Sequence, residues 1–178
     1  MIFFKKISIF VQRNTMTGIE KIKHWRQTFG LPNRETPQVC EEKEAILSLD
    51  LIAEELEEYN LALVNLKNKE DVTLSYNPQL DQIADSLGDL FFVVTQAAMI
   101  HGLDPEMLID RVYTSNMSKL CLTEQEAVDS VKAYTDKGIE THYTQLPDGK
   151  FIIKRTIDNK VLKGINFFEP DWSDLKEK

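Results

Sequence analysis

The chain has 178 residues, of which 42% are hydrophobic and 28% are charged. This length accommodates one domain of ordinary size, and the composition excludes the low-hydrophobicity regime of disordered chains. The formal net charge of -8 disfavours nucleic acid and anionic membranes as partners, so we expect neither. A polyanionic ligand would need bound cations.

The cysteine and histidine content gives no sign of a disulfide framework or a zinc site. Cys40 and Cys121 are the only thiols and lack paired spacing. The histidines at 24, 101 and 142 are far apart in the sequence and far from either cysteine. The apolar start of the chain has two lysines within it and no small-residue cleavage site after it, which is untypical of a signal peptide. We therefore expect reduced cysteines in a cytoplasmic protein.

Helix signals begin at Thr17, which with Glu20 forms a capping box. The helix that follows is expected to reach about residue 29, because Gly30 suits the position after a helix end and Pro32 blocks continuation. Apolar residues then recur at intervals of three and four, which predicts a long amphipathic helix over residues 41–66. The polar residues that follow it, up to about 77, are interpreted as a connection.

A second long helix is predicted over residues 78–101, with Pro78 in its first turn and Gly102 beyond its end. It is apolar nearly all round from residue 83, so we expect it at the centre of a helical bundle. Its most apolar run, residues 90–100, is about half the roughly 20 residues that cross a bilayer. The sequence therefore predicts a buried helix here and no membrane span.

Two further helices have clear start signals. Asp104 and Pro105 open one that should reach about residue 119. Thr123 with Glu126 forms a second capping box, and Gly138 ends the helix that it opens.

The pattern changes after this point. Residues 151–155 alternate between turn signals at 147–149 and 158–159, which predicts a small β-hairpin or a three-strand appendage. The expected fold class is all-α, a helical bundle with a small C-terminal β-hairpin appendage. The expected domains are a leader at 1–16, a helical domain at 17–138 and the appendage at 139–178.

Four glutamates crowd into five positions of the first long helix, at Glu54, Glu55, Glu57 and Glu58. Like charges at helical neighbour spacing repel by a few tenths of a kcal/mol per pair. Such a run taken alone is more often a solvated acidic face, by roughly two to one. On a helical wheel, however, Glu55 and Glu58 share a stripe with apolar residues, which predicts that both are partly buried.

The second long helix carries Asp85 and Asp89 one turn apart among almost entirely apolar residues. Neither residues 46–66 nor residues 78–100 contain a lysine or arginine. A cation from solution is therefore the expected partner of these desolvated carboxylates. Mg²⁺, with Mn²⁺ as a possible substitute, prefers carboxylate, water and phosphate oxygens. The predicted metal ligands are Glu55, Glu58, Asp85 and Asp89.

The two acidic motifs resemble the all-α NTP pyrophosphatase superfamily, the MazG-like proteins, which includes dimeric dUTPases and phosphoribosyl-ATP pyrophosphatases. Its pattern is ExxE on one helix and ExxD on a later one, jointly binding Mg²⁺. Glu55 and Glu58 match the first pair. In the second pair Ser86 stands three residues before Asp89, and the acid is Asp85, four residues before it. Both aspartates still lie on one helix face.

A third match is residues 115–120, SNMSKL, which resemble the Asn-x-x-Lys segment that these proteins place near the nucleotide. The tail beyond residue 139 is similar to a branch labelled phosphoribosyl-ATP pyrophosphohydrolase-like. The resemblance implies a Mg²⁺-dependent nucleoside triphosphate pyrophosphohydrolase that releases pyrophosphate and a nucleoside monophosphate. It implies that Asn116 and Lys119 contact phosphate or sugar, and that the chain forms a homodimer or a dimer of dimers. Glu54 is the candidate catalytic residue that orients or deprotonates the attacking water.

Other interpretations remain open at this point. A noncatalytic helical protein would bind a nucleotide or a partner through the same acids, and a purely structural bundle would leave them solvated. A di-iron bundle would need Glu-x-x-His pairs, which do not occur at these acids. The glycine-loop phosphate motifs GxxxxGK[ST] and GxGxxG are also absent from the sequence. No motif indicates the preferred base or sugar.

Overall fold

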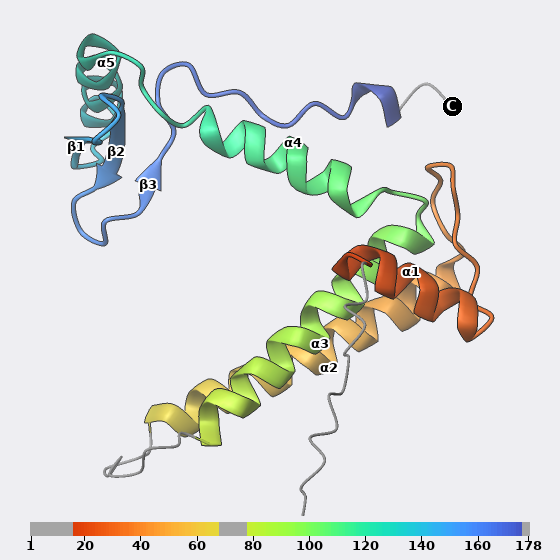
Figure 1. Ribbon diagram of the computed structural model, residues 1–178. Coiled ribbons are helices and arrows are strands. Elements are labelled where there is room, and N and C mark those ends of the chain that lie inside the picture. Colours follow the sequence, from red (N-terminus) through yellow and green to blue (C-terminus); the bar gives the residue numbers. More distant parts are fainter. Residues whose placement is uncertain (1–15, 68–77, 176–178) are drawn as a thin grey trace, which may run out of the picture. The chain divides into compact units, whose positions relative to one another are not determined.

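A computed structural model describes residues 16–67 and 78–175. They form helices α1–α5, a sheet of strands β1–β3 and a short 3-10 helix, η1 (Figure 1). Most of the predicted leader, and the connection predicted up to residue 77, lie outside the described residues. The chain divides into two compact units, one ending at Leu103 and one beginning at Asp104. This boundary differs from the expected one after residue 138, because the last two helices form a unit with the sheet.

The first unit contains α1 (Gly18–Thr28), α2 (Glu42–Lys67) and α3 (Pro78–Ile100). The capping box of α1 is confirmed: Thr17 Oγ1 accepts from the Glu20 amide at 3.2 Å, and Glu20 Oε2 accepts from the Thr17 amide at 2.6 Å. Gly30 has a φ of 72°, and the amide that follows it reaches back to the Arg26 carbonyl at 2.8 Å. This left-handed residue closes the helix as the sequence predicts.

The long helices α2 and α3 lie side by side and run in opposite directions, and α1 packs against α3 (Figure 1). Trp25 of α1 meets Phe92 edge to face, with ring centroids 5.2 Å apart. The expectation that α3 is covered all round is wrong for this unit. Leu87, Phe91 and Val94 are 43%, 53% and 49% exposed, because only α1 and α2 pack on α3 among the described elements of this unit. By length and composition alone, residues 80–100 are also long and apolar enough to cross a membrane, a property that a core helix of a soluble protein can share.

The segment between α1 and α2 is fastened to the end of α3. Arg34 forms an ion pair with Glu44 and donates to the Ile100 carbonyl at 2.6 Å. The Cys40 amide donates to His101 Nδ1 at 3.1 Å, and the Cys40 sulfur lies 3.7 Å from Nε2 of the same ring. No sequence pattern indicates this contact between a cysteine and a histidine 61 residues apart.

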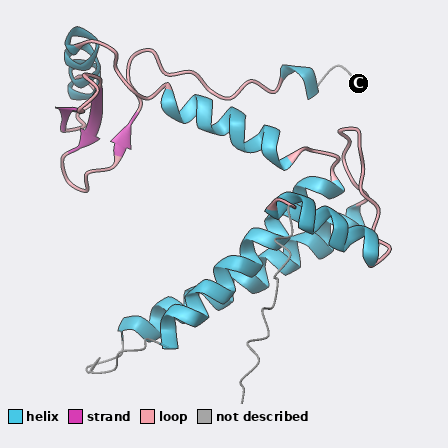
Figure 2. Cartoon of the chain, viewed as in Figure 1, coloured by secondary structure: helices cyan, strands magenta, loops and turns pink. Residues whose placement is uncertain are grey.

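The second unit contains α4 (Pro105–Met117), α5 (Glu124–Thr135), β1 (Thr141–Gln145), β2 (Phe151–Arg155), β3 (Val161–Leu162) and η1 (Ser173–Leu175). The strands pair in the order β1-β2-β3, antiparallel throughout (Figure 2). The α5 helix packs against β1 and β2. Ala127 and Ile153, both 0% exposed, form the centre of this core with Cys121 and Phe151. The three-strand appendage and the mostly helical fold class are confirmed.

The second predicted capping box forms only in part. Thr123 Oγ1 accepts from the Glu126 amide at 3.2 Å. The Glu126 carboxylate instead accepts from the Leu122 amide at 2.7 Å, one residue before the N-cap. The Leu122 and Glu126 amides at the start of α5 therefore both have hydrogen-bond acceptors, which stabilises the turn that joins α4 to α5.

Candidate functional site

Five acids from α2 and α3 gather along the surface where these helices meet; we call this set the acidic groove. Glu55 is half-buried, and its pKa is raised, first by burial and then by the negative charges of Asp89, Glu58, Glu54 and Asp85. Asp89 exerts the largest of these charge effects on Glu55. Burial and the four neighbouring negative charges thus both disfavour the ionised form of the Glu55 carboxyl.

The opposite directions of the two helices explain how the acids pair. Among the neighbouring charges, Asp89 has the largest effect on Glu55. Glu58, one turn later in α2, lines a groove of about 240 Å³ with Asp85, one turn earlier in α3. Ser86, at the position where the superfamily pattern has an acid, is buried and donates to the Gln82 carbonyl at 2.9 Å. Asp85, one residue earlier, lines the groove beside Ser86 and supplies the acid there.

The burial prediction is correct for Glu55 and wrong for Glu58. Glu58 is exposed in this unit, as are Glu54, Asp85 and Asp89. The apolar neighbours that share the stripe with Glu58 do not shield it, because its end of the α2–α3 pair opens into the groove shared with Asp85.

The acids of the groove have the chemistry of Mg²⁺ ligands. In the described part of the chain, no three His, Cys, Asp or Glu side chains are grouped so as to hold a metal ion as they stand. Mg²⁺ rarely has such an all-protein cage, since it retains waters and takes substrate phosphate oxygens beside one or two carboxylates. Hard oxygen donors whose charges repel one another, as at Glu55, are a suitable set for such a cation.

A pocket of about 140 Å³ lies one helical turn from the groove. Leu51 and Val93 line it, and these residues are four positions from Glu55 and Asp89 respectively. The rest of its lining is apolar apart from Arg26, Glu44, Ser48 and Gln96. Reasoning from the sequence missed this pocket, because its lining comes from α1, the loop after it, α2 and α3.

Arg26 organises the wall of this pocket. It is 3% exposed and donates to Asn33 Oδ1 at 3.0 Å, to Gln96 Oε1 at 3.3 Å and to the Pro32 carbonyl at 2.7 Å. Burial lowers the pKa of its guanidinium. Because Gln96 accepts from Arg26 through its oxygen, its amide nitrogen is left to donate to a ligand.

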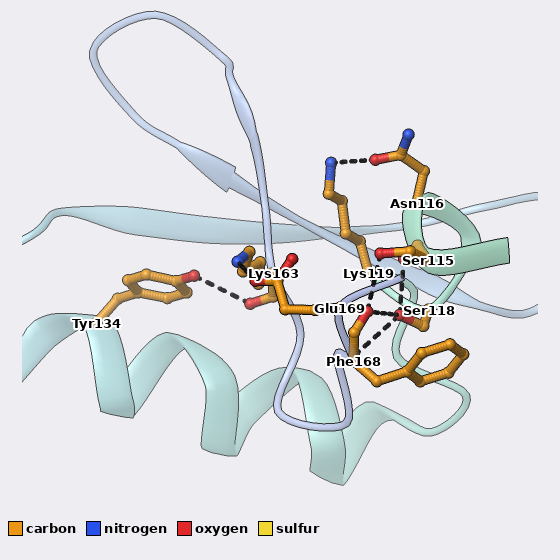
Figure 3. Close-up of polar contacts among 8 residues, drawn as sticks. All are labelled: Ser115, Asn116, Ser118, Lys119, Tyr134, Lys163, Phe168 and Glu169. Carbon is orange, nitrogen blue, oxygen red and sulfur yellow. Dashed lines mark hydrogen bonds and ion pairs between the residues drawn. The ribbon is translucent and has the colours of Figure 1, made fainter. Parts of the chain in front are cut away.

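Asn116 and Lys119 lie together in the second unit. Lys119 Nζ donates to Asn116 Oδ1 at 2.6 Å, and both side chains turn away from Phe168 (Figure 3). Asn116 is in the last turn of α4 and Lys119 is in the turn after it. The structure thus brings the predicted site residues together as two sets, the five acids of the first unit and this pair of the second.

Comparison with known proteins identifies the family. Residues 22–116, just over half of the chain, match the sequence model of PRA-PH, phosphoribosyl-ATP pyrophosphohydrolase. The chain belongs to this family. As the motifs predicted, it is therefore a member of the MazG-like all-α NTP pyrophosphatase superfamily, and PRA-PH membership implies pyrophosphohydrolase activity at the level of the family.

The PRA-PH match begins within α1, covers α2, α3 and all but the last residue of α4, and stops before Lys119 and the sheet. It includes all five acids and Asn116. An uncharacterized protein of Acanthamoeba polyphaga mimivirus is 43% identical over 81 residues, which make up 43% of this chain and 32% of that protein. The match therefore spans about a third of the length of this relative.

Proposed function

We propose that the chain is a Mg²⁺-dependent nucleoside triphosphate pyrophosphohydrolase that releases pyrophosphate and a nucleoside monophosphate. The acidic groove carries this proposal. It combines five carboxylates from two helices at the position of the family match, and Glu55 carries uncompensated repulsion from the other four. A bound cation would relieve that repulsion. The favoured ligand is therefore a polyanion that binds through the cation.

Each acid has a proposed role. Glu55, Glu58, Asp85 and Asp89 would hold Mg²⁺ or Mn²⁺, which when bound neutralises phosphate charge and lowers the pKa of water. Glu54 is exposed next to Glu55 and orients or deprotonates the attacking water. Asn116 and Lys119 contact phosphate or sugar through an amide and an ammonium group.

The pocket beside the groove supports a nucleoside as the remainder of the substrate. It is mostly apolar, and Gln96 and Ser48 supply polar groups at its wall. Such a combination is typical of small-molecule sites, in which apolar walls bury a ring and a few polar groups orient it. We place the base there, with its phosphates extending over the one turn that separates Leu51 from Glu55.

A second copy of the chain is the proposed partner. Leu87, Phe91 and Val94 follow i, i+4, i+7 spacing and so form one exposed apolar stripe on α3. A homodimer or dimer of dimers would cover this stripe. The acidic charge argues against nucleic acid and membrane partners, and we propose a cytoplasmic location.

The decisive experiment is a panel of ribo- and deoxyribonucleoside triphosphates incubated with Mg²⁺, with pyrophosphate, orthophosphate and nucleoside monophosphate measured separately. We expect pyrophosphate and monophosphate in equal amounts, and loss of both in excess EDTA. Orthophosphate as the first product would identify a phosphatase instead. Binding of a nucleotide without turnover would favour the noncatalytic nucleotide-binding protein, which is the alternative from the sequence.

A further inference from the structure

Residues 163–175, which follow β3, run back along α4 and α5, and we call them the strap (Figure 1). The first part of the strap is bonded through its backbone. The Lys163 carbonyl accepts from the Tyr134 hydroxyl at 3.1 Å, and the Ile165 amide donates to Ser130 Oγ at 2.9 Å. The Gly164 amide donates to the Lys119 carbonyl at 3.1 Å. The strap therefore contacts the backbone of one of the two proposed phosphate-binding residues directly.

The middle of the strap is held by the two serines that flank Asn116. Ser115 Oγ, on a residue that is 4% exposed, donates to the Phe168 carbonyl at 2.8 Å. Ser118 Oγ accepts from the Phe168 amide at 3.1 Å and donates to the Ser115 carbonyl at 2.7 Å (Figure 3). Both backbone groups of Phe168 are thus paired with the SNMSK turn.

The far end of the strap is fixed to the middle of α4. Arg111 donates to the Asp171 carbonyl at 2.8 Å and to both carboxylate oxygens of Asp174 at 2.6 and 2.8 Å. Its guanidinium also lies 5.3 Å from the ring centroid of Trp172. The strap consequently contacts α4 over more than one helical turn.

Gly164 makes the close approach to Lys119 possible. A Cβ at this position would lie 2.8 Å from Cys121 Sγ and 2.9 Å from the Lys119 carbonyl oxygen. Real Cβ contacts are not this short, and the carbonyl belongs to the backbone, so an alanine here would have to push the strap and the turn apart.

We propose that the strap is the positioning element for the Asn116–Lys119 pair, with Ser115, Ser118 and Gly164 as its positioning residues. This inference rests on the proposed role of Asn116 and Lys119 in binding phosphate. Lys119 lies beyond the last helical residue of α4: its amide still donates to the Asn116 carbonyl at 3.2 Å, whereas its carbonyl is held by the Gly164 amide of the strap. The strap holds that backbone from one side while the two side chains turn to the other (Figure 3).

The benefit of the strap is preorganisation. A lysine on an unsupported turn loses backbone and side-chain freedom when it binds phosphate, and this loss weakens binding. With the strap in place this freedom is already lost on folding, since its bonds to Ser115, Ser118 and Lys119 form without a ligand. The strap lies wholly outside the residues of the family match, so the match does not account for it.

The first test compares KM for a nucleoside triphosphate among point variants of the full chain. Ser118→Ala removes the hydroxyl that holds Phe168 and should raise KM about fivefold, the effect of one neutral hydrogen bond. Gly164→Ala should raise KM at least as much. Ser118→Thr keeps a hydroxyl and should restore most of the affinity. The control is Thr135→Ala, which removes a hydroxyl that donates to the Val131 carbonyl of its own helix.

A double-mutant cycle separates positioning from a general structural role. If the strap acts through Lys119, then Ser118→Ala should add little to the rise in KM that Lys119→Met already causes. Fully additive effects in the double variant would overturn the proposal. If Lys119→Met alone leaves KM unchanged, the proposed function of Lys119 fails, whatever the strap does.

Hydrogen exchange measures the strap without any turnover. Ser118→Ala should speed exchange in residues 163–175 while exchange in α2 and α3 stays as in the wild type. If Ser118→Ala does not fold, Arg111→Gln replaces it, because it releases the far end of the strap at an exposed ion pair. Rapid exchange of the strap together with an unchanged KM would show that the strap is only structural and would end the proposal.

Discussion

The carboxylates of the acidic groove and the hydroxyls under the strap differ in whether their neighbours oppose or satisfy them. Around Glu55, four further acids add negative charge and raise its pKa. Under the strap, Ser115 and Ser118 pair with both backbone groups of Phe168. The polar groups at this turn are thus satisfied within the second unit, whereas the acids around Glu55 repel one another. Violations of ordinary folding rules of this kind are expected at functional sites.

Both units expose apolar residues, among them Ile109 and Leu122 of the second, but the packed core of the second unit contrasts with the apolar stripe on α3. Ala127 and Ile153 in the second unit are fully covered, whereas Phe91 and Val94 on α3 are about half exposed. The first unit therefore has both unrelieved charge and uncovered apolar surface, which are the two features that a cation with substrate and a second copy of the chain would remove.

The largest expected effect comes from Glu55→Gln, which removes charge from the centre of the groove and keeps the size of the side chain. Pyrophosphate release should fall by about 100-fold, as when a group that supports a metal site is lost. The melting temperature in EDTA should stay the same or rise, because one repulsive charge is gone. Activity assays and thermal melts with and without Mg²⁺ test this.

The matched control for this variant is Glu57→Gln. Glu57 belongs to the same acidic run but is not among the charges that raise the pKa of Glu55. It should retain activity. Its free energy of unfolding should lie within about 0.5 kcal/mol of the wild-type value, as is usual for surface substitutions. Equal losses in both variants would show that net charge, and not the groove, controls activity.

The exposed stripe on α3 gives the next prediction. Phe91→Asp should weaken self-association by more than about tenfold, because it places a charge where an aromatic residue is expected to be buried between copies. Size-exclusion chromatography with light scattering over a dilution series measures this. Val39→Asp, at a side chain that is 90% exposed between α1 and α2, is the control and should leave association unchanged.

A smaller effect should follow from filling the pocket beside the groove. Ser48→Phe should raise KM for a nucleoside triphosphate about tenfold, since a ring would occupy the space assigned to the base. Competition by inorganic triphosphate, which has no base, should be unchanged. Leu49→Phe, at an exposed neighbour, controls for added bulk. Equal loss of affinity for both compounds would place the base elsewhere.

The smallest predicted effect concerns the pH dependence of the second unit. Arg155, followed by the Lys160 amide, lowers the pKa of Asp158 from 3.8 to about 2. Because the folded-state pKa is lowered, this carboxylate stabilises the fold above its ordinary pKa, and the contribution disappears as pH falls through about 2. The direction is opposite to that of Glu55, whose pKa is raised.

Thermal melts of Asp158→Asn between pH 2 and 6 test this difference. The variant should melt slightly below the wild type at the upper end of the range, and the two should converge as pH falls. Glu140→Gln removes another exposed acid of the same unit and serves as the control. A gap that stays constant down to pH 2 would contradict the role of the Asp158 carboxylate.

The sequence by itself determined the helix ends and the helix faces that carry the acids. Thr17, Gly30 and Asp104 act within one turn of chain, and their contacts form as their local chemistry requires. The spacing of Glu55 and Glu58, and of Asp85 and Asp89, also depends only on helical geometry. Local rules of this kind do not need the rest of the fold.

Only the tertiary structure decided which of these groups meet. The groove that Glu58 shares with Asp85 depends on how two long helices align, and that alignment leaves Glu58 exposed where the sequence predicted partial burial. The bonds from Ser115 and Ser118 to Phe168 join residues 53 and 50 positions apart. Periodicity along one helix contains no information about such distant partners, because their positions are set by the packing of whole segments against one another.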